Sequence, residues 1–270
     1  MIGGVVVVVL GGAGALVWLL RYRTDTKVTP VGVDAAVAEF EQSRRVSLPA
    51  EPASDPPAAT AGDDAGPLAV LPEAGVYAYA TSGGDGVDAL GGASHEYPAL
   101  TTLTVTPAGC GVAQRWVAAE ERFDQFLTCA TPDGSGVELA AFTEFHEFFG
   151  ISERDDFLCT GDPRPVGAAA GTTWTLVCAR AGERATWSGT VLEPETITVD
   201  GTDVATDHVA WEIDNGDARD RQLTETWYLA GTDLVVRRVI DNRTIEGSVV
   251  GDVAYTETAE LLLQSLTPSR

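Results

Sequence analysis

Positive charge is scarce in this sequence of 270 residues, which has 17 Lys and Arg against 40 Asp and Glu and a formal net charge of -23. A negative field of this size repels the phosphate backbone of nucleic acids. It also repels free anionic headgroups at a membrane surface. We therefore expect no nucleic-acid partner.

Motifs that carry catalysis or hold metals are missing as well. The sequence contains no GxSxG nucleophile elbow, no HExxH helix and no CxxC pair. Its histidines each stand beside an acid, in the pairs His95-Glu96, His146-Glu147 and Asp207-His208. Neighbours along a strand point to opposite faces, so these pairs are poor base-and-orienter couples. Asp155-Asp156 and Glu144/Glu147 are expected by chance among so many acids. We predict that the protein is not an enzyme and needs no metal or cofactor.

Cysteine is present in a small, even number, at positions 110, 129, 159 and 178, with 18 residues inside each consecutive pair. A turn near Ala119 and Glu120 places Cys110 opposite Cys129, and Cys159 with Cys178 closes a Gly/Pro-rich loop. We predict these two disulfides, which require an oxidising compartment. The alternative is four reduced thiols in a cytosolic domain.

One long apolar segment opens the chain. Residues Ile2 to Leu20 carry no charge, and nineteen residues of helix span about 28 Å, close to one hydrocarbon core. We predict a transmembrane anchor over residues 1–23. A dinucleotide-binding glycine turn is the weaker interpretation of the same segment, because no GxGxxG follows the valine run.

The orientation of this anchor is open to two interpretations. Arg21, Arg23 and Lys27 follow the apolar segment, and by the positive-inside rule they would hold the following domain in the cytoplasm. The predicted disulfides favour the outside. We favour a single-pass protein of the cell membrane, with the bulk of the chain extracytoplasmic.

Two short regions separate the anchor from the folded domain. Residues 24–45 form a juxtamembrane segment with a short helix, which has Asp34 as N-cap and Val33, Val37 and Phe40 on one side. This helix has four possible environments: the membrane surface, the domain, a second copy of the chain or solvent. Residues 46–74 are rich in Pro, Ala and Asp and lack aromatic residues, so we predict a disordered linker.

From residue 75 onward the hydrophobic period is two, which is typical of strands. The predicted strands are Val76 to Thr81, Leu100 to Thr106, Gly111 to Ala118, Arg122 to Ala130, Val137 to Phe145, Thr172 to Arg180, Arg184 to Leu192, Thr196 to Val199, Asp203 to Ile213, Gln222 to Leu229, Leu234 to Asn242 and Val249 to Leu263. We therefore predict a mainly β domain over residues 75–270. It is a long antiparallel meander that forms a curved sheet, a half-barrel or a barrel.

Tryptophan and glycine supply the candidate binding residues. Trp174, Trp187, Trp211 and Trp227 lie in predicted strands, as does Trp116, and few helices are available to cover the sheet. A concave, aromatic-lined face is one hypothesis, and a tryptophan-filled core is the other. Thr81 to Pro98 reads as a glycine-rich loop that contains the polar candidates Asp85, Asp88 and His95.

A resemblance to known proteins rests on these segments. GVYAYATSGG, the Thr/Val strands and WYLAGTDLVVRR resemble uncharacterised membrane-anchored cell-envelope proteins of actinobacteria. The hairpin from Trp227 to Arg238 also resembles the late hairpin of half-barrel lipid-carrier domains of the LolA and LppX type. That resemblance implies a curved sheet with a lipid site. Those families are lipid-modified at an N-terminal cysteine, which this chain lacks.

Two classes of function follow. In the first, a non-catalytic, membrane-anchored envelope protein binds a lipid or another apolar ligand on its concave sheet. In the second, the sheet is fully packed and the outer surface binds another envelope protein, as in a structural or adaptor protein. A connected apolar cavity of a few hundred Å³ favours the first class, and a filled interior favours the second.

Overall fold

The computed structural model describes residues 28–46, 71–248 and 251–270. Its α-helix is α2 (Val33–Val46), and a short 3-10 helix, η1, spans Ala89–Gly91. The strands are β1 (Gly75–Val87), β2 (Ala93–Glu96), β3 (Leu100–Ala108), β4 (Gly111–Ala119), β5 (Arg122–Ala130), β6 (Gly136–Phe148), β7 (Ile151–Gly161), β8 (Arg164–Pro165), β9 (Thr173–Arg180), β10 (Glu183–Val191), β11 (Glu195–Val199), β12 (Thr202–Asp214), β13 (Arg221–Leu229), β14 (Val235–Ser248) and β15 (Gly251–Leu263).

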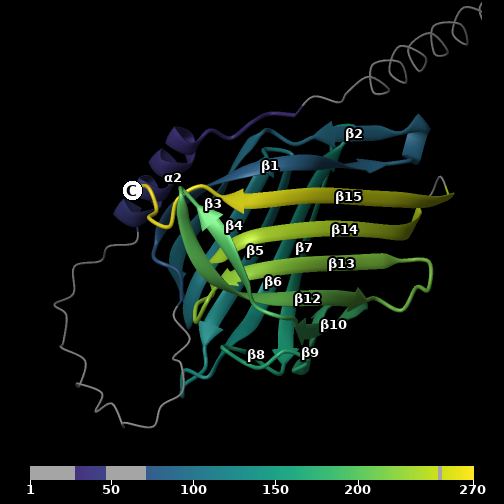
Figure 1. The fold of residues 1–270 in the computed structure, drawn as a ribbon. Coiled ribbons are helices and arrows are strands. Elements are labelled where there is room, and N and C mark those ends of the chain that lie inside the picture. Colours follow the sequence, from purple (N-terminus) through teal and green to yellow (C-terminus); the bar gives the residue numbers. More distant parts are fainter. Residues whose placement is uncertain (1–27, 47–70, 249–250) are drawn as a thin grey trace, which may run out of the picture.

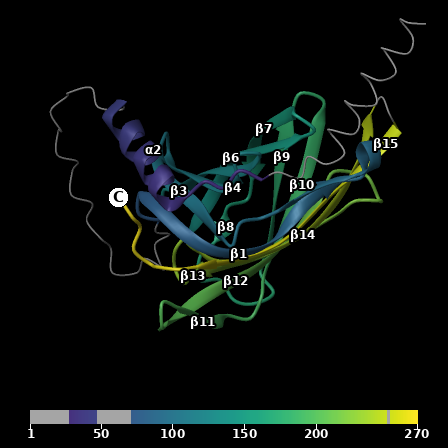
Figure 2. The same cartoon turned by 90° about the horizontal axis from the view of Figure 1, so that it is seen from above.

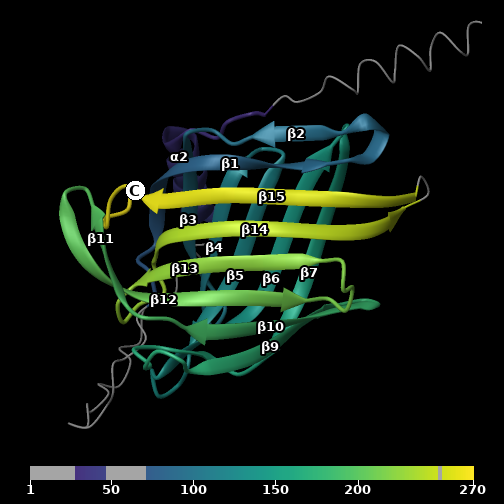
Figure 3. The same cartoon turned by 45° about the vertical axis from the view of Figure 1, so that its right-hand side comes forward.

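Hydrogen bonds between neighbouring strands close the sheet into a ring (Figures 1 and 3). The order around it is β10, β9, β7, β6, β5, β4, β3, β1, β15, β14, β13 and β12, and β12 pairs back with β10. Within the described ranges, 12 antiparallel strands thus form a closed barrel. β2, β8 and β11 are additional strands that pair with β1, β6 and β12. Of the three architectures left open by the sequence, the barrel is the one that forms.

Two groups of strands face each other across the barrel. The front wall consists of β1, β12, β13, β14 and β15, and the back wall consists of β3 to β7, whose strands cross those of the front wall at a steep angle (Figures 1 and 2). Side chains meet through the interior. The guanidinium of Arg122 on β5 lies 3.0 Å from the carboxylate of Glu257 on β15, and Arg238 on β14 lies over the ring of Phe126 on β5. The barrel is therefore narrow enough for its two walls to touch.

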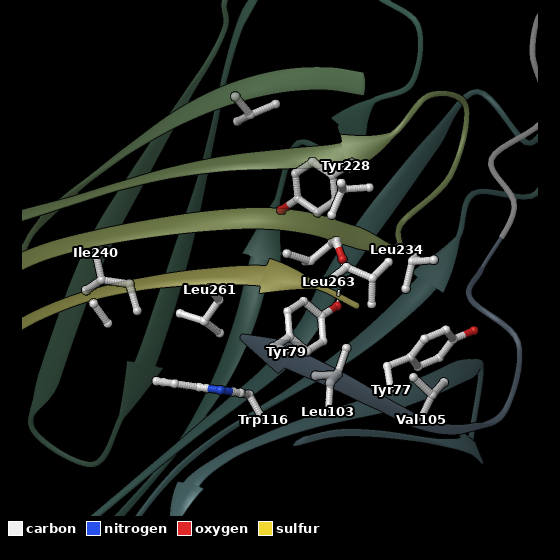
Figure 4. Packing of buried hydrophobic residues seen from close by; sticks show 14 of the residues in the cluster. Tyr77, Tyr79, Leu103, Val105, Trp116, Tyr228, Leu234, Ile240, Leu261 and Leu263 are labelled. Atoms are coloured by element: carbon white, nitrogen blue, oxygen red, sulfur yellow. Dashed lines mark hydrogen bonds between the residues drawn. The ribbon is translucent and has the colours of Figure 1, made fainter. Parts of the chain in front are cut away.

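The main apolar core fills the region where β1, β3 and β4 meet β15 (Figure 4). Tyr79, Leu103, Trp116 and Leu261 are buried there in one cluster. The Tyr79 hydroxyl donates a hydrogen bond to the backbone oxygen of Val235 at 2.6 Å. Alternate residues of each strand point inward, so the period of two in the sequence is the direct cause of this core.

Helix α2 packs on the outside of the barrel, beside β1 and β3. Phe40 and Ala36 are buried against Val76 of β1. Just before the helix, Thr29 donates hydrogen bonds from its backbone nitrogen and its hydroxyl to the carboxylate of Glu121, at 2.9 and 2.7 Å. Of the environments considered for this helix, the domain surface is the one that the structure shows.

The regions ahead of the barrel are described only in part. The predicted membrane span, Ile2 to Leu20, lies outside the described residues, and so do residues 47–70 of the predicted linker. At the end of that linker, Leu71 packs against the barrel core and Ala74 against the α2 cluster. In the described part of the chain, no helix has the length and apolar character needed to cross a membrane.

Both predicted disulfides are confirmed. Cys110 is bonded to Cys129, which ties the turn before β4 to β5. Cys159 is bonded to Cys178, and these residues lie directly opposite each other on β7 and β9. Each bond therefore reinforces an existing strand pair of the back half of the ring.

The segment from Thr81 to Pro98 is not the loop that its glycine content predicts. β1 continues to Val87, and the chain returns through η1 as β2, which pairs with β1. The glycines permit close backbone contact: a Cβ on Gly83 would lie 2.0 Å from the backbone oxygen of Thr258 on β15. The prediction of a loop from glycine content was therefore wrong, because the segment forms a tightly packed hairpin.

Strand β7 was not predicted from the sequence. Glu153, Arg154, Asp155 and Asp156 follow one another, a pattern typical of an exposed loop. In the barrel, Glu153 and Asp155 face the interior, which is polar at this point, while the other side of β7 faces solvent. Because both faces of β7 are polar here, the alternation that marks a half-buried strand is absent.

Docking of α2 predicts a loss of stability when its anchor is removed. We expect Phe40→Ala to lower the free energy of unfolding by about 3 kcal/mol, because the variant leaves a cavity between α2 and β1. Urea unfolding followed by tryptophan fluorescence measures this change. Gln42→Ala, at an exposed position of the same helix, should leave the free energy of unfolding within about 0.5 kcal/mol of the parent value. Equal stability of both variants would show that α2 does not contribute to the fold.

Candidate functional site

The barrel encloses a cavity of about 780 Å³ beside the packed core. Buried residues such as Tyr79, Trp116 and Arg122 line its inner part. Glu183 and Arg184, at the start of β10, also line it and are exposed to solvent. The cavity therefore opens to solvent near the hairpin that joins β9 to β10.

Aromatic rings form one side of this cavity. The ring of Phe142 on β6 lies 5.1 Å from that of Phe126, 6.0 Å from that of Phe157 and 5.2 Å from that of Trp187. The Trp187 ring in turn lies 6.2 Å from that of Trp211 on β12. These centroid distances are those of favourable stacked and edge-on aromatic pairs. The rings make a continuous apolar surface from the back wall, across β10, to the front wall.

The four candidate tryptophans occupy three different environments. Trp187 and Trp211 line the cavity. Trp174 is buried behind them, with its ring 5.0 Å from that of Trp211. Trp227 lies outside the cavity, on the outer side of the front wall, where its ring stacks on His208 at 4.0 Å. The concave aromatic face is thus made by two of the four, together with phenylalanines that the sequence analysis did not single out.

A cluster of buried charges lies at the side of the cavity formed by β5, β6 and β15. Arg122 is 1% exposed and contacts Asp124 at 2.5 Å, Glu257 at 3.0 Å and Glu144 at 3.5 Å. Tyr97 donates a hydrogen bond from its hydroxyl to Glu257 at 2.7 Å. One buried guanidinium therefore holds carboxylates from both walls.

The cluster continues through two histidines. His146 lies 2.9 Å from Glu144 through Nε2 and 3.8 Å from Asp85 through Nδ1. The other oxygen of the Asp85 carboxylate lies 2.9 Å from Nδ1 of His95. The His95 ring stacks on Phe148, which lines the cavity, at 4.6 Å. Asp85 and His95, predicted from the glycine-rich segment, thus do come together.

Asp88, the third polar candidate from that segment, is separate from the cluster. Its side chain is exposed at the turn after β1. Its carboxylate accepts a hydrogen bond from the backbone nitrogen of Ala254 at 2.7 Å. Asp88 therefore joins the β1 turn to β15 and does not line the cavity.

The electrostatics of the cluster follow from its burial. Burial and the neighbouring Arg122 lower the pKa of His146, but Glu144 and Asp85 outweigh them and raise it to about 9. Burial raises the pKa of Glu144, yet His146 and Arg122 overcome this effect and lower it to about 2. Burial dominates at Asp124 and raises its pKa to about 6, despite the contact with Arg122. His146 and Glu144 are accordingly a charged pair at neutral pH.

Two further arginines of the cavity lining form ion pairs. Arg164 lies 2.9 Å from Asp233 near the β13–β14 turn, and Gln114 donates a hydrogen bond to the same carboxylate at 2.7 Å. Arg180 pairs with Asp155 and, at 2.6 Å, with Glu183 near the cavity mouth. The interior is therefore amphipathic, with aromatic surface between groups of paired charges.

These charged groups form a connected network inside the barrel. The acids and histidines of the cluster contact one another and Arg122. In the part of the chain that the structure describes, Oδ2 of Asp85 and Nδ1 of His146 are buried without a hydrogen-bond partner. Among the described residues, no group of three or more His, Cys, Asp and Glu side chains is placed to hold a metal ion. The absence of a cofactor remains a prediction from the sequence.

The sequence analysis missed most of this cluster because it compared residues next to each other. Arg122 and Asp124 on β5, and Glu144 and His146 on β6, are two residues apart and so share a face. Their strands pair in register, with Asp124 opposite Glu144. An i, i+2 search of adjacent strands could have found them.

The raised pKa of His146 predicts a pH dependence of stability. In the folded protein the pKa is about 9, above its ordinary value of 6.5, so protonated His146 stabilises the fold fully below pH 6.5. That contribution is lost as the pH rises through 9. We expect His146→Gln to unfold at lower urea concentration at pH 6 and to show a flatter stability curve between pH 6.5 and 9. An unchanged slope in the variant would contradict the ion pair with Glu144.

Comparisons with known proteins identify no family. No protein-family model matches the chain, and no curated protein matches it. Among solved structures, the chain is similar to a "putative lipoprotein" from Parabacteroides distasonis ATCC 8503, at 11% identity over 72% of this chain and 96% of that one, with a TM-score of 0.30. A likeness at that score supports no conclusion about fold or function.

Proposed function

We propose that this protein is a non-catalytic carrier that binds an amphipathic, largely apolar molecule inside its barrel. The observation that supports the proposal is the cavity of about 780 Å³. Ligand pockets commonly measure about 300 to 1,000 Å³ and are lined mainly by aromatic and apolar side chains. The alternative adaptor function requires no such space inside the domain.

The shape of the apolar surface favours a chain-like ligand. The rings from Phe126 to Trp211 form an extended strip, and Ile213 continues it on β12 toward the open end. Burial of hydrocarbon against such a strip stabilises a complex by about 25 cal/mol for each Å² removed from water. An acyl chain is the simplest molecule with this form.

The absence of catalysis is part of the same proposal. Asp124, Glu144 and Glu257 contact Arg122, and His146 contacts Glu144. A general base must reach a proton on the substrate, and these groups are already occupied by one another. We assign them to holding the walls of the barrel together.

We further propose that the carrier is anchored in the cell membrane and lies outside the cytoplasm. Two disulfides support an oxidising compartment. The uncharged segment from Ile2 to Leu20 supports the anchor. A carrier held at the membrane would meet its ligand there, at high local concentration.

Obstruction of the cavity tests the carrier function. Ala185 on β10 lines the cavity, and Thr186, the next residue, lies outside its lining. We expect Ala185→Trp to weaken binding of the fluorescent apolar probe N-phenyl-1-naphthylamine at least about tenfold, because the indole occupies the apolar strip. Thr186→Trp, which places the same ring on the outer face, should bind the probe like the parent chain.

The same experiment has a clear contrary outcome. If the parent chain binds no probe, and solvent extraction of the purified protein releases no lipid, the adaptor function should replace the carrier function. If both tryptophan variants bind as the parent does, the probe site lies outside the barrel. Thermal unfolding provides a second measurement, since a ligand at a hundredfold excess over its Kd stabilises a fold by about 2.7 kcal/mol.

A further inference from the structure

We propose that the ligand has an anionic head, a carboxylate or a phosphate, and that Arg238 binds this head inside the cavity. The inference rests on the carrier function proposed above and specifies the chemical class of the ligand. It is carried by a contrast among the arginines of the cavity interior. Five arginines line the cavity, and one of them, Arg184, is exposed at its mouth. Of the other four, three are held by protein carboxylates, and Arg238 is not.

The three paired arginines are Arg122, Arg164 and Arg180. Their nearest carboxylate partners are Asp124 for Arg122, Asp233 for Arg164, and Asp155 with Glu183 for Arg180. Each positive charge is thus compensated by the protein itself, as buried charges require. Nε of Arg122 and Nη1 of Arg164 have no hydrogen-bond partner among the described residues, but the charge of each of the three guanidinium groups is compensated by a carboxylate.

Arg238 has a different environment. It lines the cavity from β14, and its guanidinium lies over the Phe126 ring at 5.0 Å. Within the described part of the chain it forms no ion pair, and its buried Nε has no hydrogen-bond partner. A guanidinium stacked on a ring keeps its N–H groups free at the edge of its plane, where they match a carboxylate or a phosphate.

The neighbours of Arg238 are apolar or neutral. Thr226 on β13 and Leu261 on β15 lie opposite it in register, and Tyr79 is close enough for the guanidinium to offset part of the burial that raises the pKa of that phenol. The Thr226 hydroxyl is itself buried without a hydrogen-bond partner among the described residues. It is available as a donor to the same head.

The acids of the cavity do not oppose this assignment. Glu257 is held by Arg122 and Tyr97, and Asp233 by Arg164 and Gln114. Their negative charge is compensated at short range. Glu153 and Arg184 also line the cavity without an ion pair in the described structure, but both are exposed to solvent. Arg238 is therefore the uncompensated charge of the less exposed interior of the described barrel. An anionic head at Arg238 would also place an attached hydrocarbon chain beside Phe126, where the aromatic strip begins.

The test compares three probes with the same chain length: dodecanoate, dodecyl phosphate and 1-dodecanol. Each displaces N-phenyl-1-naphthylamine from the full 270-residue chain at neutral pH. We expect at least one anion to bind about tenfold or more tightly than the alcohol, the gain of a charge-assisted pair. Arg238→Met should remove this preference and leave the affinity for the alcohol unchanged. Arg238→Lys, which keeps the charge, should retain part of it.

A matched control lies next to Arg238. Arg237 is on the outer face of the same strand, where it pairs with Glu260 at 2.7 Å. Arg237→Met should therefore retain the preference for anions. Stronger binding of dodecanoate or of dodecyl phosphate supports the inference and tells which head the site selects.

The outcomes separate the inference from the carrier function. If all three probes bind equally well to the parent chain, or if Arg238→Met keeps the preference for anions, the role of Arg238 is wrong while the carrier function stands. If none of the probes binds, the carrier function itself fails. The measurement thus gives a result against each proposal independently.

Discussion

The pairing of β10 with β12 is the interaction on which the rest of the structure depends. Residues Thr186 to Val191 of β10 pair antiparallel with residues Asp214 to Val209 of β12. This pairing converts a long meander into a ring. Without it the sheet would have two exposed edges, which invite pairing with other chains. Closure also creates a barrel interior. Every side chain that points into it must pack against other side chains, form a hydrogen bond or ion pair, or line a cavity.

Closure explains the buried ions. A narrow barrel brings β5 against β15, so inward polar residues of the two walls meet in an interior that water reaches poorly. Arg122 and Glu257 are each 1% exposed, and desolvation of either alone would cost several kcal/mol. Their contact at 3.0 Å, with Asp124 and Tyr97 on their remaining groups, offsets this cost. These pairs select one alignment of the walls, because any shift leaves a buried charge without its partner.

Sequence reasoning predicted the strands and the disulfides because each depends on local pattern. Alternating residues such as Trp227 and Leu229, or an even pair of cysteines, carry their signal within a short segment. The cluster around Arg122 does not, since its members come from β1, β2, β5, β6 and β15 and meet only after closure. Trp227 shows the same limit. Its strand was predicted, but whether its side chain points into the barrel or out of it depends on which side of the sheet closure turns inward. Strand β7 was not predicted for a related reason: its inner face is polar, so its sequence lacks the alternation of apolar and polar residues.

The cavity persists because polar contacts cross the barrel where apolar packing would otherwise draw the walls together. Arg122 bridges to Glu257 beside the core, and Gln114 bridges to Asp233 at the other side of the interior. Further approach of the walls would have to break these buried hydrogen bonds, and each broken bond to a charged group costs about 1.5 to 3 kcal/mol. Beside these bridges the barrel keeps the cavity of about 780 Å³ that the aromatic strip lines. In the proposed carrier, an apolar molecule would enter this space without breaking an ion pair. The charges that make the interior unlike an ordinary apolar core would then also keep it open for that ligand.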